Sequence, residues 1–527
     1  MRYNWRISMR ATVGERHSPS VWDALAKGVF ANYASHFIGI VCSVIMAPML
    51  ISHLGGEGFG AFVAVGSILP YLFVLNLGTE SAVPKYVAEL WARKNLDGLH
   101  KLISSFFLVY VSVGLLLVLL AGICFPYIHH VVKTSPQLVF PTKIFFLLTV
   151  VNFALYLSFG VFSGLLFGLQ KLHIPYWIDA LWYVLNTMAA FTALHLGYGL
   201  IGVGVGSLLV RVLICIISAV MARTRCSQVR VSLGAFDRQL SRRLASPSLY
   251  FFLINVANLW IFHTDNIIIS TLLGAGYVGA YSLAFRLCKV PAGLIVQVAK
   301  ILLPHVSELD ARGDFGRLRW LHVQTTKYSL VLSLMTFTCV ATFGERLIGL
   351  WVGPENFVGM PVLLCFCVMW PLSAAMESSS VILQGTAHHK KLAWALILEG
   401  ALNIGLSILL ARRAGVLGVA VGTLIARLAI TTWFVPWYTC RVLEEDRWEY
   451  VKSVAPAFLP VLPSAGLALL LAGLRTSPVL LVLGGSAAIG AMYIAVFYKL
   501  SLGRGEQTAL WGRISILLGR STLAAGS

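Results

Sequence analysis

The sequence predicts an all-α polytopic membrane protein of about 14 transmembrane helices, arranged as two pseudo-symmetric six-helix bundles plus two C-terminal helices. Three observations predict this class. Hydrophobic residues make up 58% of the chain and charged residues only 12%, against about 25% charged in globular domains. Apolar runs long enough to cross a bilayer recur along the whole chain. The first six runs also match the next six, about 219 positions later.

Each predicted span holds roughly 20 apolar residues, which as a helix cross a hydrocarbon core of about 30 Å. The first run carries Asn32 and His36 and is too long for a signal peptide, so we expect it to be retained as a helix. The fourteen spans lie near 29–52, 59–80, 102–125, 142–168, 174–197, 199–222, 248–272, 278–303, 327–350, 357–385, 391–411, 415–438, 454–474 and 478–500.

Lysine and arginine alternate between the loops as the positive-inside rule requires. Of the 40 basic residues, 29 lie in alternate segments on one side, 6 lie on the other side and 5 lie inside spans. Both termini should therefore be cytoplasmic, in a multi-pass protein of the cytoplasmic (inner) membrane. The net charge of +19 follows from this topology and from attraction to anionic lipid, so we expect no nucleic-acid partner.

The internal repeat is visible at glycine, proline, glutamate and arginine positions that hydrophobicity alone does not match, such as Pro84 and Glu89, which return as Pro304 and Glu308. Residues 54–62 return as 273–281, and 199–211 return as 415–427. Leu185-Asn186 is matched by Leu402-Asn403. Gly202 and Gly206, like Gly418 and Gly422, are spaced as in small-xxx-small helix packing.

The predicted domain organisation follows from the spans and the repeat. It comprises a cytoplasmic N-terminal tail (1–27), an N-terminal six-helix bundle (28–225), a basic cytoplasmic linker (226–247), a C-terminal six-helix bundle (248–440), two additional transmembrane helices (441–500) and a cytoplasmic tail (501–527).

Sequence motifs for catalysis, metal binding or cofactor binding are lacking. No HExxH or Walker motif is present, and Cys365-Phe-Cys367 has no second pair at metal-ligand spacing. His129-His130 and His388-His389 lie in or near loops, where we expect them to be solvated. We therefore predict a transporter without catalytic residues, metal or cofactor. Any uphill transport must draw on an ion gradient or on the membrane potential.

Polar side chains inside spans are costly in hydrocarbon, so they indicate a cavity or a binding partner. In the eighth span, Arg286, Lys289 and Lys300 share a cationic helix face. Polar stripes in the first and seventh spans are expected to face a central cleft. Together with two arginines in the sixth and twelfth spans, these residues are the predicted substrate-binding set: Arg286, Lys289, Lys300, Arg211, Arg427, Asn32, His36, Asn255 and Asn258.

Acidic residues inside spans are candidates for ion coupling or gating: Asp265, Asp179, Glu377 and Glu399. Asp265 and Arg286 lie at similar depth on neighbouring helices, so they form either an outer gate or a site at which Arg286 contacts substrate. Lys300 lies near the cytoplasmic boundary and either binds substrate or extends to the interface. Lys289 has no acidic residue one turn away on its own helix, which favours an anion-binding role.

Several motifs resemble those of the multidrug/oligosaccharidyl-lipid/polysaccharide superfamily, specifically its polysaccharide transporter branch of O-antigen-type flippases. These motifs are the Leu-Gly-x-x-Gly-x-Gly-x-Phe turn at 54–62, Leu77-Gly78, Pro84-Lys85-Tyr86, and Asp265 before Leu273-Gly274 and Gly279-Ala280-Tyr281. The resemblance covers about 30–440. It implies two bundles that alternate access to an undecaprenyl-diphosphate-linked oligosaccharide, which is moved from the inner to the outer leaflet for lipopolysaccharide and other surface polysaccharides.

The expected partners are this lipid-linked oligosaccharide, the lipid bilayer, a coupling H⁺ or Na⁺, and other polysaccharide-assembly membrane proteins. Two alternatives belong to the same superfamily: a lipid II flippase and an ion-coupled multidrug exporter. The cationic stripe argues against the exporter, because exporters of cationic drugs need acidic cavities. A membrane glycan polymerase or ligase would need a large outer loop that this chain lacks, and a membrane scaffold would not need polar faces matched in both halves.

Overall fold

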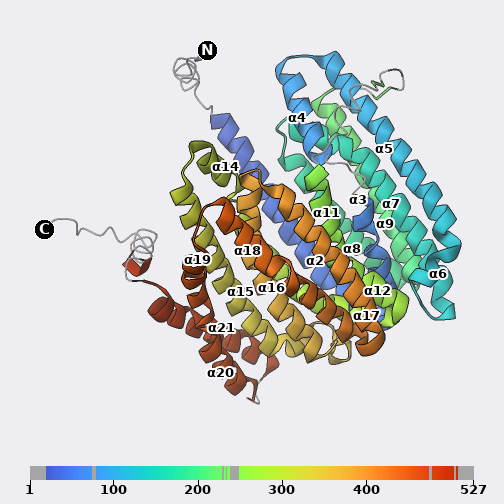
Figure 1. Cartoon of the computed structure of the whole chain (residues 1–527). Helices are drawn as coiled ribbons and strands as arrows, with labels where there is room; N and C mark the ends of the chain where they lie inside the picture. Colours follow the sequence, from blue (N-terminus) through green and yellow to red (C-terminus); the bar gives the residue numbers. More distant parts are fainter. Residues whose placement is uncertain are drawn as a thin grey trace, which may run out of the picture. The chain divides into compact units, whose positions relative to one another are not determined.

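The computed structural model describes residues 19–73, 79–227, 231–232, 234, 236–237, 249–473, 477–503 and 506–508. Leu77-Gly78 and most residues of the predicted N-terminal tail, linker and C-terminal tail lie outside these ranges. The described residues are almost entirely helical (Figure 1). They belong to two compact units, residues 1–252 and 253–527.

The described chain contains eleven helical segments that are long and apolar enough to cross a membrane. Two of them, Lys27–Phe73 and His389–Val442, each contain two helices joined at a kink, at Gly55 and Gly415. Together with helix α8, which is 23 residues long, they give the fourteen helices that the sequence predicts. The prediction of an all-α polytopic fold is confirmed.

The first unit is built from the helices α2 to α9, numbered as in Figure 1. Helix α7 contacts both α5 and α9, and α8 contacts α2 and α9. The bounds are α2 Pro19–Gly66, α3 Leu69–Phe73, α4 Thr79–Ala92, α5 Leu96–Cys124, η2 Phe125–Tyr127, α6 Ile128–Val131, α7 Pro136–Gly168, α8 His173–His195 and α9 Gly199–Arg225.

The second unit repeats this order from α11 onward and adds the helices of the C-terminal pair. Helix α16 occupies its centre and contacts α13, α15, α17 and α18. The bounds are α11 Leu249–Phe262, α12 Thr264–Leu272, α13 Ala275–Lys300, α14 Leu303–Arg312, α15 Phe315–Val352, η4 Pro354–Asn356, α16 Met360–Gly385, α17 His389–Ala429, α18 Thr431–Val442, α19 Arg447–Val454, η5 Ala455–Phe458, α20 Val461–Ala472, α21 Pro478–Val496 and η6 Phe497–Ser501.

The repeat extends to backbone conformation. Gly55 and its repeat partner Gly274 both have positive φ, 70° and 109°, and so do Gly199 and Gly415, 54° and 57°. Side chains other than glycine rarely adopt this region, so the glycines fix the turns that end the first and fifth spans of each bundle. The caps match as well: Asn95 accepts a hydrogen bond from Gly98 N, and Asp314, 219 positions later, accepts one from Arg317 N.

In each bundle a short amphipathic helix, α4 or α14, packs closely against the fourth span, α7 or α16, and the contact is at a repeat-related glycine. A Cβ atom at Gly168 would lie 2.5 Å from Val87 on α4, and one at Gly385 would lie 2.5 Å from Val306 on α14. Val87 and Val306 are both fully buried. Only glycine lets these backbones approach so closely, so the two glycines set the position of α4 on α7 and of α14 on α16.

We predict that Gly385→Ala destabilises the protein by about 1–3 kcal/mol, because the added methyl group overpacks against Val306. Gly405→Ala is the matched control, because nothing lies within 4 Å of a Cβ atom at that position. The measurement is the melting temperature of the purified protein in detergent. Equal melting temperatures for the two variants would contradict the close approach.

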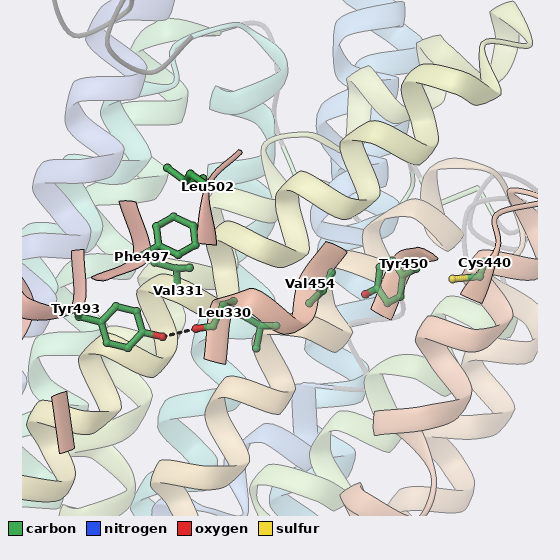
Figure 2. Close-up of a cluster of buried hydrophobic side chains, with 9 residues drawn as sticks. Leu330, Val331, Cys440, Tyr450, Val454, Tyr493, Phe497 and Leu502 are labelled. Atoms are coloured by element: carbon green, nitrogen blue, oxygen red, sulfur yellow. Dashed lines mark hydrogen bonds between the residues drawn. The ribbon is translucent and has the colours of Figure 1, made fainter. Parts of the chain in front are cut away.

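The C-terminal helices pack on α15 through an apolar cluster (Figure 2). Tyr493 on α21 is fully buried and donates a hydrogen bond to the carbonyl oxygen of Ala457 at 2.7 Å. Phe497 and Leu502 pack in the same cluster as Leu330 and Val331 of α15. The extra helices are therefore an integral part of the second unit.

Candidate functional site

A buried carboxylate network lies inside the second unit, where α11 ends and α12 begins. Asp265 is in the first turn of α12 and is 5% exposed. Its Oδ2 atom accepts hydrogen bonds from the Tyr281 hydroxyl at 2.7 Å and the Thr423 hydroxyl at 2.9 Å. Its Oδ1 atom is buried without a hydrogen-bond partner among the described residues. Asp265 thus takes its hydrogen bonds from two neutral hydroxyl groups, and Arg286 is not among its donors.

Further oxygen atoms surround the Thr423 hydroxyl. Asn403 Oδ1 lies 2.9 Å from it and the Val419 carbonyl oxygen 3.1 Å. Ser407 Oγ lies 3.0 Å from Asn403 Oδ1 and 3.4 Å from the same carbonyl. The Asp265, Asn403 and Val419 oxygens offer more lone pairs than the Thr423, Ser407 and Tyr281 hydroxyls have protons. An excess of acceptor oxygens in a buried site is the surrounding that a hard cation prefers.

Helix α17 bends at Gly415, so it has a first arm before this residue and a second arm after it. The two arms pack closely at Gly418 and Gly422, which the sequence predicted as packing positions. A Cβ atom at Gly418 would lie 2.1 Å from the Leu410 carbonyl oxygen, and one at Gly422 would lie 2.8 Å from Ser407 N. These glycines therefore allow the second arm to pack directly on the first. This packing confirms the small-xxx-small interpretation, and it places Thr423 beside Asn403 and Ser407.

Arg427 and Glu399 form a buried ion pair in the second unit. The exposed fractions of the two side chains are 1% and 0%, and the Arg427 Nη2 to Glu399 Oε1 distance is 2.8 Å. Arg427 also donates to Ser373, and Thr431 donates to Glu399. The guanidinium lies 5.5 Å from the Phe262 ring. Every charged group in this cluster is paired, so its geometry favours a structural role.

Arg211, the repeat partner of Arg427, lies in a different environment in the first unit. Its Nε atom donates to Asn152 Oδ1 at 3.1 Å, and its guanidinium lies 4.6 Å from the Trp182 ring and 5.2 Å from the Tyr156 ring. No ion pair includes Arg211 among the described residues. A cavity of about 390 Å³, lined by Arg211, Asp179 and Asn186 among others, adjoins it.

The other residues of the predicted substrate-binding and ion-coupling sets differ in their charge partners and in their exposure. Lys300 lies 3.6 Å from Glu377, so these two predicted residues neutralise each other. Lys289 is exposed, with its ammonium group 5.6 Å from the Phe285 ring, and no carboxylate pairs with it among the described residues. Arg286, Asn32 and Asn258 are half-buried, whereas His36 and Asn255 are exposed.

One cluster has residue types that bind metals. His322, Cys440 and Glu445 place ligand atoms within 4.8 Å of one another. However, His322 Nδ1 lies 2.9 Å from Glu445 Oε2, His322 Nε2 lies 2.9 Å from Ser379 Oγ, and the ring stacks on Tyr450 at 4.6 Å. Because both ring nitrogens already make hydrogen bonds, we interpret the cluster as a structural contact between α15, α16 and the segment after α18.

Sequence reasoning did not single out Asn403, Ser407, Thr423 or Tyr281 as members of the hydrogen-bond network around Asp265. A usable signal existed, since Asn186 and Asn403 are repeat partners, as are Ser207 and Thr423. Polar residues that occur at matching positions of the two halves, inside otherwise apolar helices, indicated both the network around Asp265 and the cavity beside Arg211.

Comparison with known proteins agrees with this architecture. The fold is similar to that of a lipid II flippase, MurJ, in an inward closed conformation, with a TM-score of 0.70 at 14% identity over 93% of this chain and 99% of that one. The sequence is 21% identical to the uncharacterized membrane protein EpsK of Bacillus subtilis, over 80% of this chain and 85% of that protein. It is 23% identical to Agl15 of Haloferax volcanii, a probable low-salt glycan biosynthesis flippase, over 37% of this chain and 42% of that protein.

The fold is thus that of a multi-pass membrane protein, of the kind also found in these flippases and transporters. Residues 25–310, more than half of the chain, match the family described as polysaccharide biosynthesis protein. The chain belongs to this family.

Proposed function

We propose that this protein is a flippase that moves an anionic, polyprenyl-diphosphate-linked oligosaccharide from the inner to the outer leaflet by alternating access. The family and the relatives named as flippases support a lipid-linked glycan as cargo. The product would supply a surface polysaccharide such as the O-antigen of lipopolysaccharide. The membrane would be the cytoplasmic (inner) one, with both termini in the cytoplasm, as the loop charges indicate.

The observation that carries the anionic cargo is Lys289. It lies near the middle of α13, in a segment that can span a membrane, and no carboxylate pairs with it among the described residues. A lysine at the centre of a membrane helix costs about 2.5–3.5 kcal/mol, which a bound pyrophosphate would offset. Arg286, one turn earlier, adds a second cation. Lys300 is a weaker candidate because Glu377 neutralises it.

Two sources of energy are available to such a flippase. Moving two negative charges outward across an inside-negative membrane releases roughly 4–5 kcal/mol per 100 mV. A cation that binds at Asp265 and returns inward would reset the empty protein. The oxygen-rich network around Thr423 favours Na⁺ at this position, and H⁺ is the alternative.

The test of cargo transport is deletion of the gene, followed by measurement of surface polysaccharide and of lipid-linked precursor. We expect loss of the polysaccharide and accumulation of the precursor. Wild-type protein and Lys289→Arg should rescue, because both keep the cation. Lys289→Ala and Arg286→Ala should each restore at most about a tenth of the polysaccharide, the loss expected when a charged contact is removed. Full rescue by both alanine variants would contradict the anion site.

A lipid II flippase is the second candidate, favoured by the likeness in fold to MurJ. Expression in a strain depleted of its peptidoglycan flippase separates the two. Growth of that strain would identify lipid II as cargo, whereas failure to grow, together with rescue of the polysaccharide defect, would identify another lipid-linked glycan.

A further inference from the structure

The polar cavity in the first unit differs from the matching region of the second unit at two positions. Arg427 is neutralised by Glu399, and the residue that the repeat places at the position of Glu399 is Trp182. At the position of Asp265 the first half carries Met46. Both residues line the cavity of about 390 Å³, so the first unit has neither of these two carboxylates and has a cavity beside the matching arginine.

The cavity has hydrogen-bonding groups of both kinds without partners. Arg211 uses only its Nε atom, so its two terminal nitrogens are donors with no partner among the described residues. Trp182 Nε1, a donor, and Asn186 Oδ1, an acceptor, are buried without partners. The polar residues of the lining are Thr149, Asn152, Asp179, Asn186, Ser207 and Arg211. Buried polar groups without partners cost free energy, so the cavity is suited to a polar ligand.

The mixture of groups decides the class of ligand. A simple anion would satisfy Arg211 and Trp182 but not the buried acceptor Asn186 Oδ1. A cation would satisfy that acceptor and leave the donors unpaired. A hydroxyl group both donates and accepts, and several hydroxyl groups on one small ring would meet all of these partners.

The remaining walls agree with that choice. Phe153, Tyr156 and Tyr183 line the cavity beside the polar residues, and aromatic rings pack against the apolar faces of small rings. The volume lies at the lower end of the range for small-molecule sites, about 300–1,000 Å³. We propose that this cavity of the first unit is a sugar-binding site that takes one neutral monosaccharide residue of the transported glycan. The proposal rests on the flippase function for the source of the sugar.

The test uses the purified full-length protein in lipid nanodiscs and free monosaccharides as probes. Glucose, galactose and N-acetylglucosamine are titrated to roughly 100 mM, because a single sugar offers few contacts. Sodium acetate and sodium glucuronate are the anionic probes. Binding is read from tryptophan fluorescence and from the shift in melting temperature. The variants are Asn186→Leu, which removes the acceptor, and Trp182→Phe, which removes the Nε1 donor and keeps an aromatic ring. Thr192→Val, on the same helix but exposed and outside the lining, is the matched control.

We expect saturable binding of at least one neutral sugar by the wild type and Thr192→Val, with at least tenfold weaker binding by Asn186→Leu and Trp182→Phe. Binding of acetate and glucuronate alone would overturn the proposal in favour of an anion site. No binding of any sugar, or equal binding by all variants, would overturn it in favour of a cavity filled with water.

Deletion and rescue experiments in cells distinguish failure of the sugar-site proposal from failure of the proposed flippase function. If deletion causes precursor to accumulate and Asn186→Leu rescues fully, while no sugar binds in vitro, the sugar site is wrong and the flippase stands. If sugar binding is confirmed and deletion leaves surface glycans and precursors unchanged, the site stands and the proposed flippase function is wrong.

Discussion

Asp265→Asn is expected to reduce glycan transport at least about tenfold while the protein reaches the membrane at normal levels. Asparagine keeps the size of the side chain and can still accept the hydrogen bonds from Tyr281 and Thr423. What it removes is the charge that a coupling cation would neutralise. The measurement is surface polysaccharide in the deletion strain, with membrane levels determined by immunoblot.

Asp97→Asn is the matched control, because Asp97 is exposed in the first turn of α5 and should be neutral for transport. Thr423→Val adds a graded test. It removes a candidate oxygen ligand without changing the charge, so transport should need a higher Na⁺ concentration. Wild-type transport by Asp265→Asn at normal membrane levels would exclude the cation site. An unchanged Na⁺ requirement in Thr423→Val, with activity that follows pH instead, would identify H⁺ as the ion.

Glu399→Gln is expected to cause the largest loss of stability, about 3–5 kcal/mol, because Arg427 would become an uncompensated charge in the protein interior. We expect little folded protein in the membrane and a lower melting temperature for what remains. The measurement is size-exclusion elution and thermal unfolding in detergent.

Two further variants separate loss of the charge balance from loss of packing. Replacing both partners, Glu399→Met with Arg427→Met, should recover much of the stability, because apolar pairs of similar volume often substitute for buried ion pairs. Arg211→Met in the first unit should cost less than Glu399→Gln, because no carboxylate pairs with Arg211 among the described residues. Equal stability of Glu399→Gln and the wild type would show that the pair contributes nothing to the fold.

The sequence was sufficient to predict the helices, because the physical signals involved are local or periodic. Twenty apolar residues must form a helix in lipid, and glycines such as Gly55 and Gly415 mark turns that other residues rarely adopt. Repeat partners reinforced each assignment. The boundaries were less well predicted: α15 begins at Phe315, whereas the apolar run suggested 327, because its N-terminal end continues as a helix among polar side chains.

The site was predicted only in part, because pairing depends on contacts between distant helices. Asp265 was identified as a candidate because a carboxylate inside an apolar span costs free energy. Its partner Thr423 could not be identified in this way, because it lies 158 positions away in the sequence. Arg427 and Glu399, assigned to substrate binding and ion coupling, pair with each other. Likewise Lys300 pairs with Glu377. Helix periodicity shows which face a residue occupies, and it does not show which charge on another helix neutralises it.

The difference between Arg211 and Arg427 has a consequence for exchange of the two halves. The two halves differ at the repeat positions of Asp265 and Glu399, so we expect that neither half can replace the other. A chimaera made of two copies of the first half would carry methionine in place of the acid at position 265, and one made of two second halves would carry an acid in place of Trp182. We expect both chimaeras to express as membrane proteins and to fail to complement the deletion strain.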